Sequence, residues 1–425
     1  MTHSPSGLLN LSSVSSLLRG RVPGQLIIQV TDACNARCPQ CEMRVTNRYQ
    51  RAEVAEDDVL RSLDAAAQRG VAAVSFTGGE PFLDFERLLA WLQRAGDLGI
   101  PLIRTGTNGF FLRHWQHPSF EERVHRMAEQ LAATRLRNLW FSIDSADTGV
   151  HETMRGLPGV IEGMARALPI FHQHGIWPTA NLGINRNTGT RPLRLADGAS
   201  EDARQAFHGE CLEAFSGFYE KVLGMGFTIV NFCYPMSVES APEPGLLAVY
   251  RASSADDVVS FRQEEKELLF QAMADAVAAY RHRIRIFSPR NVLYSLVEQY
   301  RNGEPHGYAC RGGLDFFFVS AADGNTYPCG FRAEENLGKF WQLDPRRQPD
   351  TSCTRCDWEC FRDPSNLLGP FLELGQDPLG LVRRFRRDPA WVRLWTGDLR
   401  YQRACDYFDG RRPPDPRRLA RFAPA

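Results

Sequence analysis

Apolar runs of strand length alternate with helix-like stretches through the first half of the chain. The runs lie at 25–30, 71–76, 101–105, 141–144, 177–185 and 226–234. Between the first two runs, Val54, Val59 and Leu63 stand among charged residues at helical spacing. Strands that alternate with helices are typical of a parallel sheet covered by helices. The pattern therefore predicts an α/β fold.

The second half of the chain predicts a different order of helices and strands. A long helix over 255–282 is followed by a short strand at 284–287 and a helix at 292–300. A strand at 314–320, an Asp-Gly turn and a return strand ending at Cys329 then predict a hairpin. The tail after Phe361 is helical in pattern and rich in arginine.

Three cysteines follow the first apolar run at the spacing Cys-x3-Cys-x2-Cys. They are Cys34, Cys38 and Cys41. Three thiolates are one too few for a closed zinc site, which takes four ligands. The set suits a four-iron cluster in which one iron stays open for another ligand.

A second motif, Gly78-Gly79-Glu80, stands at the end of the second apolar run. Glycines allow the backbone to approach a ligand without a side-chain clash, and Glu80 adds one fixed negative charge. Such a triplet alone is usually a turn. Its position one βα unit after the cysteines makes it a candidate binding element.

The two motifs together resemble the radical S-adenosylmethionine (SAM) enzymes. The resemblance implies a partial (β/α)6 TIM-like barrel in which the three cysteines hold a 4Fe-4S cluster and SAM chelates the open iron. It places Gly78, Gly79 and Glu80 at the methionine end of SAM. Further candidate SAM contacts follow later strands: Asn108, Ser142 and Asp144.

Gln40 departs from the family pattern. An aromatic residue usually precedes the third cysteine and meets the adenine. An amide side chain stacks poorly on a base but can hydrogen-bond its edge, so Gln40 is kept as a candidate cofactor contact. Cys233 ends the sixth predicted strand, and strand ends of such barrels face the active site. It is a candidate hydrogen-atom donor, although plain packing is the simpler interpretation, as it is for Cys211.

A second cysteine group lies near the predicted hairpin: Cys310, Cys329, Cys353, Cys356 and Cys360. Spacing alone leaves structural zinc and iron both open. The segment resembles the SPASM or twitch module of radical SAM enzymes, but it lacks that module's full seven-cysteine pattern. The resemblance implies one auxiliary 4Fe-4S cluster on Cys310, Cys329, Cys353 and Cys356, with Cys360 as an alternative ligand. Cys405 is too distant to place, and two clusters are the second choice.

The predicted organisation has five parts. These are an N-terminal extension (1–21), the radical SAM barrel (22–237), connecting helices and a strand (238–305), the auxiliary cluster module (306–365) and a basic helical tail (366–425). The first strand begins near residue 25, which leaves no room for an N-terminal leader-peptide-binding domain and favours a small-molecule substrate over a peptide.

Composition limits the classes of partner that we expect the protein to bind. The formal net charge is zero, so no global field draws the protein to nucleic acid or a membrane, and the basic tail is read as a solvated helix face. No apolar run reaches the length of a membrane span, and no secretion signal is evident. Cysteines at metal spacings favour a reducing, cytoplasmic compartment.

The functional prediction is an enzyme. By resemblance, a one-electron donor such as flavodoxin or ferredoxin reduces the first cluster, SAM is cleaved to a 5′-deoxyadenosyl radical, and the radical takes a hydrogen atom from a substrate C–H bond. We expect an oxidative or bond-forming modification in natural-product or cofactor biosynthesis. The alternatives are a radical SAM peptide maturase and, in another class, a non-catalytic iron–sulfur or zinc protein.

Overall fold

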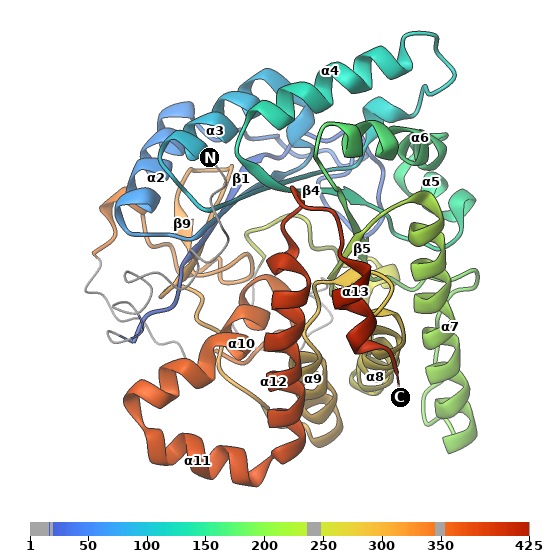
Figure 1. Ribbon diagram of the computed structural model, residues 1–425, viewed down its shortest axis with the longest axis vertical. Helices are drawn as coiled ribbons and strands as arrows, with labels where there is room; N and C mark the ends of the chain where they lie inside the picture. The colour runs from blue at the N-terminus through green and yellow to red at the C-terminus, as the bar shows by residue number, and fades with distance from the viewer. Residues whose placement is uncertain (1–16, 18–19, 236–247, 345–352, 425) are drawn as a thin grey trace.

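A curved parallel sheet with helices on its outer face organises the molecule (Figure 1). The computed structural model describes residues 17, 20–235, 248–344 and 353–424. In these ranges the sheet has nine strands in the order β7-β6-β5-β4-β3-β2-β1-β8-β9. The strands are β1 (Gln25–Thr31), β2 (Ala73–Gly78), β3 (Leu102–Thr107), β4 (Leu136–Ser142), β5 (Thr179–Gly183), β6 (Ile229–Cys233), β7 (Arg285–Ile286), β8 (Phe316–Val319) and β9 (Thr326–Tyr327). The predicted α/β partial barrel is therefore confirmed, as an open sheet.

Helices connect the strands and cover the sheet. They are α2 (Glu56–Gln68), α3 (Phe85–Asp97), α4 (Phe120–Ala133), α5 (Thr148–Arg155), α6 (Val160–Gln173), α7 (Glu201–Met225), α8 (Gln263–Tyr280), α9 (Arg290–Asn302), α10 (Glu359–Gln376), α11 (Pro378–Arg387), α12 (Pro389–Ala404) and α13 (Pro416–Leu419). Local signals set their ends. Ser200 caps α7 by accepting from the Ala203 N–H, and Gly226 closes it in the left-handed conformation (φ 101°).

The two faces of the sheet differ in chemistry. On β4, Leu139 and Phe141 point toward the helices and are buried to 1% and 0% exposure. Their neighbours Trp140 and Ser142 point to the inner face and remain partly exposed. Because side chains alternate along a strand, the same division recurs on β3 and β6. The outer face is thus core, and the inner face of β3 to β6 is a polar wall.

The hairpin of the second cysteine group continues the barrel sheet. Strand β8 pairs in parallel with β1, with Leu26 opposite Phe317, and then antiparallel with β9. The predicted hairpin turn is confirmed by the bond from the Gly324 N–H to the Ser320 carbonyl. The two cysteine groups are therefore attached to neighbouring strands of one sheet.

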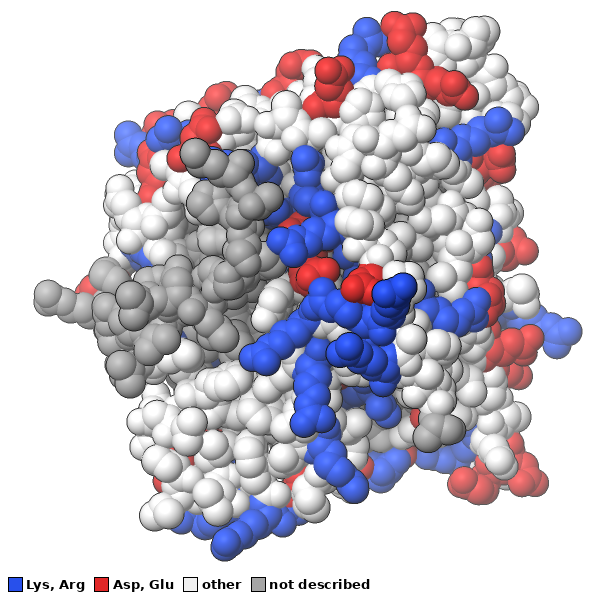
Figure 2. Space-filling model, in the orientation of Figure 1, with Lys and Arg blue, Asp and Glu red and all other residues white. Residues whose placement is uncertain are grey.

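The C-terminal tail packs under the barrel. Gly410 bonds to Trp177 and Arg137, next to the N-terminal ends of β4 and β5, and Asp409 pairs with Arg137. Figure 2 shows Lys and Arg side chains gathered across the middle of the face on which α12 and α13 lie. Two of the tail arginines, Arg412 and Arg418, pair with Asp406.

Strand β4 begins five residues before the predicted start at Phe141. The apolar pattern missed this part because Arg137 and Asn138 are polar. Asn138 donates to the Thr179 hydroxyl on the inner face, and Arg137 pairs with the tail. Asp144, predicted to end the strand, lies beyond it.

Asp398 provides a pH-sensitive link between α12 and α9. It is buried and accepts a bond from the Asn291 N–H. Burial raises the pKa of Asp398 to about 6, although Arg281 opposes the shift. A carboxyl whose pKa is raised by folding favours the folded state below its unfolded pKa, and this contribution is lost as the pH rises through about 6.

We therefore expect the stability of the wild type relative to Asp398→Asn to fall between pH 4 and pH 7, by up to about 3 kcal/mol. Thermal unfolding of the two proteins across this range measures the difference. A difference that stays constant with pH would contradict the assignment.

Candidate active site

The first cysteine group lies on the loop after β1. Cys34, Cys38 and Cys41 are close enough for their charges to interact, and burial is the main cause that raises the pKa of each thiol, to about 12 for Cys38. The Ala36 N–H donates to the Cys34 sulfur at 3.5 Å. Bound metal would offset the burial, because thiolate is the form that binds metal.

The Gly78-Gly79-Glu80 segment holds this loop by its backbone. The Gly79 N–H donates to the Thr31 carbonyl (2.7 Å) and the Glu80 N–H to the Ala33 carbonyl (2.8 Å). A Cβ atom at Gly79 would lie 2.0 Å from the Ala33 oxygen, and one at Gly78 would lie 2.3 Å from the Thr31 oxygen. The glycines were predicted to admit a ligand. In the structure their lack of a side chain lets the cysteine loop approach, and the ligand contact stays a prediction.

Glu80 joins this segment to the end of β3. Its Oε1 accepts from the Thr107 hydroxyl (2.8 Å) and the Phe82 N–H, and its Oε2 accepts from the Asn108 N–H (2.7 Å). Burial raises the pKa of Glu80 to about 7, against the opposing hydrogen bonds. Oε2 keeps one lone pair for a further donor.

Asn108 connects β3 to the first cysteine. Its Nδ2 lies 2.9 Å from the Asn35 Oδ1 and 3.9 Å from the Cys34 sulfur, while its Oδ1 accepts from the Phe110 N–H. The structure thus brings Asn108, Glu80 and the cysteine loop together, whereas their predicted contact with SAM stays a prediction.

Asp144 is occupied by an arginine that the sequence analysis did not single out. Arg155 donates to both carboxylate oxygens, at 2.7 and 2.8 Å. Burial disfavours the Asp144 charge, but Arg155 more than offsets it and holds the pKa of Asp144 below its ordinary value. The Arg155 charge also acts on Cys34 and Cys38. The one signal for Arg155 in the sequence was its place in the segment that follows the fourth predicted strand.

Gln40 and Ser142, two further predicted SAM contacts, differ from each other in their surroundings. The Gln40 side chain bonds to Asp144, and its Oε1 is buried with no partner among the described residues. A buried acceptor without a donor fits a bound ligand at this position. Ser142 ends β4 on the inner face and is partly exposed.

Cys233 also lies on the inner face, at the end of β6. Its sulfur is 3.4 Å from the Asn181 Nδ2, and Glu359 at the start of α10 is close by. Cys360 bonds to Glu359 at 3.3 Å, and its charge interactions are with Glu359, Cys233 and Arg104. Cys360 therefore faces the barrel interior beside Cys233.

The second cysteine group gathers four thiols at the hairpin. The Cys310 N–H donates to the Cys353 carbonyl, and the charges of Cys310, Cys329, Cys353 and Cys356 act on one another. A small hollow is lined by Cys310, Cys353 and Cys356. Burial raises the pKa of Cys329 to about 12, and the Phe331 N–H donates to its sulfur. Cys405 and Cys211 are buried in other parts of the core.

The first cysteine group supplies three thiols, and the second group supplies four. Among the described residues, no three His, Cys, Asp or Glu side chains are grouped so that they could hold a single metal ion. In a four-iron cluster each thiolate binds a different iron, so the thiolates do not converge on one atom. Thiolates are the usual ligands of iron–sulfur clusters, so the chemistry of these donor sets is of the kind that such clusters need.

Residues 249–251 connect the two cysteine groups. The Tyr250 N–H donates to the carbonyl of Gly330, which adjoins Cys329, and the Arg251 carbonyl accepts from the Glu42 N–H beside Cys41. The Tyr250 hydroxyl lies 2.8 Å from the Thr77 hydroxyl on β2. No cysteine or metal-type spacing marks this segment in the sequence.

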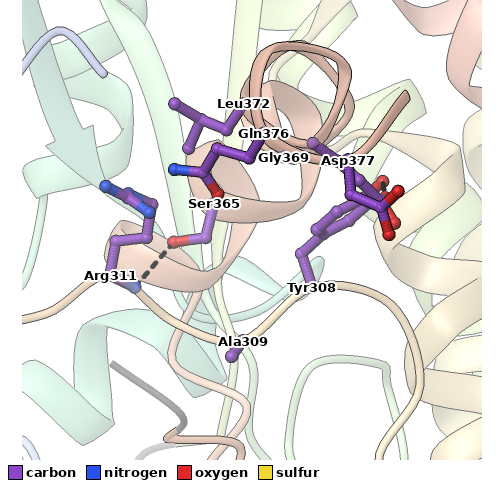
Figure 3. A pocket seen from close by; sticks show the side chains of 9 residues that line it. Tyr308, Ala309, Arg311, Ser365, Gly369, Leu372, Gln376 and Asp377 are labelled. Atoms are coloured by element: carbon purple, nitrogen blue, oxygen red, sulfur yellow. Dashed lines mark hydrogen bonds between the residues drawn. The ribbon is translucent and has the colours of Figure 1, made fainter. Parts of the chain in front are cut away.

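A surface pocket lies between residues 308–311 and α10 (Figure 3). Ala309 and Arg311 line it, whereas Cys310 lines the hollow of the second cysteine group. Its polar groups are already used: Arg311 pairs with Asp315, and Glu373 accepts from Tyr308 and Arg384. Arg311, Tyr308 and Glu373 are therefore engaged with protein partners.

Comparison with known proteins agrees with this geometry. Residues 28–186 match the model of the radical SAM superfamily. The chain contains a radical SAM domain. An AdoMet-dependent heme synthase of Methanosarcina barkeri is 23% identical over 323 residues, 73% of this chain and 77% of that protein. A GTP 3′,8-cyclase of Synechococcus is 32% identical over 43% of this chain and 50% of its own.

Solved structures also resemble this chain at low sequence identity. That of Streptococcus suis SuiB bound to S-adenosylmethionine has a TM-score of 0.47 and 16% identity, and it covers 77% of this chain and 67% of that one. The cysteine-rich region that includes Cys353, Cys356 and Cys360 fits an auxiliary cluster domain. The described helices include none that could cross a membrane.

The close approach of Gly79 to the cysteine loop gives a direct test. We expect Gly79→Ala to displace residues 31–33, lower the unfolding temperature and reduce the iron retained by Cys34, Cys38 and Cys41. Gly209→Ala is the matched control, because Gly209 lies in α7 and a Cβ there meets nothing within 4 Å. Iron analysis and thermal unfolding of both variants check this. Equal behaviour of the two would refute the role given to Gly79.

Proposed function

We propose that this radical SAM enzyme carries out an oxidative or bond-forming modification of a small molecule, with SAM bound at the first cysteine group and an auxiliary cluster at the second. The observation that carries the proposal is the contact network among the cysteine loop, Gly79, Glu80 and Asn108. It joins the ends of β1, β2 and β3 into one binding edge.

In this proposal Cys34, Cys38 and Cys41 hold the 4Fe-4S cluster. When bound, the cluster and SAM supply an organic radical that removes a hydrogen atom from a C–H bond. Glu80 uses its remaining lone pair to accept from the SAM amino group. Arg155, oriented by Asp144, places positive charge beside the thiolates and the SAM carboxylate. Ser142 and Gln40 offer polar contacts to the nucleoside.

The auxiliary 4Fe-4S cluster is assigned to Cys310, Cys329, Cys353 and Cys356. The mutual electrostatic effects of these four thiols support the assignment, as does the hollow that three of them line. Cys360 interacts with Cys233 and Glu359 instead, which supports a role for it at the barrel interior. The auxiliary cluster would accept the electron left on the substrate.

A small-molecule substrate is supported by two relatives, which are named for making heme and for cyclising GTP. Radical SAM enzymes also need an electron donor. We propose a flavodoxin or ferredoxin for this role. The partly exposed polar inner face of β3 to β6 is the surface available to the substrate.

The radical reaction is tested by anaerobic incubation of the reconstituted protein with SAM and dithionite. We expect 5′-deoxyadenosine from the wild type and a loss of at least about 100-fold in Cys34→Ala, because the cluster loses one ligand. Cys405→Ala, at a buried cysteine outside both groups, is the control. Equal deoxyadenosine from Cys34→Ala and the wild type would refute the assignment of the first group.

Metal content tests the second group. We expect about eight irons in the wild type and about four in Cys353→Ala. Cys360→Ala should retain the wild-type number, because Cys360 lies with Cys233 rather than with the four. Zinc in place of the second set of irons would contradict the auxiliary cluster.

A further inference from the structure

An arginine on the inner face of the barrel has no described acidic partner. Arg104 lies in the middle of β3, opposite Ser75 on β2 and Asn138 on β4. Its Nε donates to the Ser75 hydroxyl at 3.0 Å. No other hydrogen bond or ion pair of Arg104 is found among the described residues.

Other enclosed arginines of the barrel have more hydrogen-bond acceptors around them than Arg104. Arg155 donates to both oxygens of Asp144, and Arg186 donates to both oxygens of Glu265. Arg285 donates to Thr228 and to the Asp409 carbonyl. A buried guanidinium is costly unless a partner offsets its lost hydration. Arg104, with one described hydrogen bond to a hydroxyl, thus has fewer partners than these three arginines.

The environment of Arg104 is enclosed but reachable. Burial lowers its pKa from the ordinary value, and Cys360 is the one titratable group among the described residues whose charge acts on it. Nevertheless the side chain is only half-buried, whereas its neighbours Ile103 and Thr105 on the outer face are at 0% exposure. The guanidinium therefore borders space inside the barrel.

An apolar surface lies beside this charge. Trp140 on β4 is partly exposed on the same face, and its indole lies across Gly106, where a Cβ would meet the ring nitrogen at 1.8 Å. Glycine at 106 thus makes room for the indole next to Arg104 on the wall. A positively charged group beside an aromatic ring suits a ligand that has an acidic end and an apolar body.

We propose that Arg104 binds a carboxylate of the substrate, whose apolar body lies against Trp140. The inference rests on the proposed function in taking the inner face as the substrate surface. The Nε of Arg104 is used by Ser75, which leaves its two terminal nitrogens to bind both oxygens of a carboxylate. One guanidinium with no second cation acting on it matches a singly charged anion better than a phosphate.

The probe is benzoate, with benzamide as a neutral compound of the same shape. Reconstituted protein is heated with each at equal ionic strength, without SAM or reductant, so that the result does not depend on radical formation. We expect benzoate to raise the unfolding temperature of the wild type by about 2 °C or more and benzamide to leave it unchanged. Arg104→Met should abolish the benzoate shift.

Arg166→Met is the matched control, because Arg166 pairs with Glu162 on the exposed surface of α6. It should retain the benzoate shift. No shift in the wild type, an equal shift with benzamide, or a shift that survives in Arg104→Met would each overturn the proposal.

A second measurement needs no ligand. If Arg104 awaits a substrate carboxylate, Arg104→Met should unfold at or above the wild-type temperature, because a half-buried charge without a described carboxylate partner has been removed. A fall of several degrees, reproduced by Cys360→Ser, would instead identify the Cys360 thiolate as the counter-charge and overturn the proposal.

Discussion

The backbone contact between the end of β2 and the cysteine loop is the constraint on which the rest of the site depends. Two peptide N–H groups, of Gly79 and Glu80, bond to carbonyls at the start of the loop. The loop otherwise has little regular structure of its own, so these bonds set its position relative to the sheet. Glu80 then carries the constraint to β3 through Thr107 and Asn108. Three strand ends are thereby fixed with respect to one another.

The enclosed arginines of the protein differ in the partners of their charges. Although the chain as a whole is neutral, its enclosed arginines are divided between tasks. Arg155 and Arg186 are fixed by carboxylates, and the first of them brings positive charge to the thiols. Arg104 lacks such a partner among the described residues. Asp144 and Glu265 thus hold the first two in place, whereas Arg104 is the one that we propose for a substrate carboxylate.

The sequence predicted the parts of this molecule that depend on local pattern. The apolar runs located the strands, and the spacing of Cys34, Cys38 and Cys41 located the loop. It could not predict that Gly78 and Gly79 serve the loop's own backbone, because that contact depends on the crossing of two segments far apart in the chain. Arg155 and Tyr250 were missed for the same reason, since each acquires its role from neighbours brought close by folding. Polar residues such as Asn138 concealed the start of β4, because its inner face never enters the core.

The position of β1 has a consequence for the synthesis of the protein. This strand lies between β2 and β8 in the sheet, yet β8 is among the last strands to leave the ribosome. Until then one edge of β1, which includes the apolar run Leu26-Ile27-Ile28, has unpaired peptide groups. Such an edge can pair with strands of other chains. A nascent chain cut before the hairpin would keep this edge permanently. The sheet of the barrel is therefore complete only after the cysteine-rich extension has been synthesised. Until then the unpaired edge of β1 makes the nascent chain prone to aggregation.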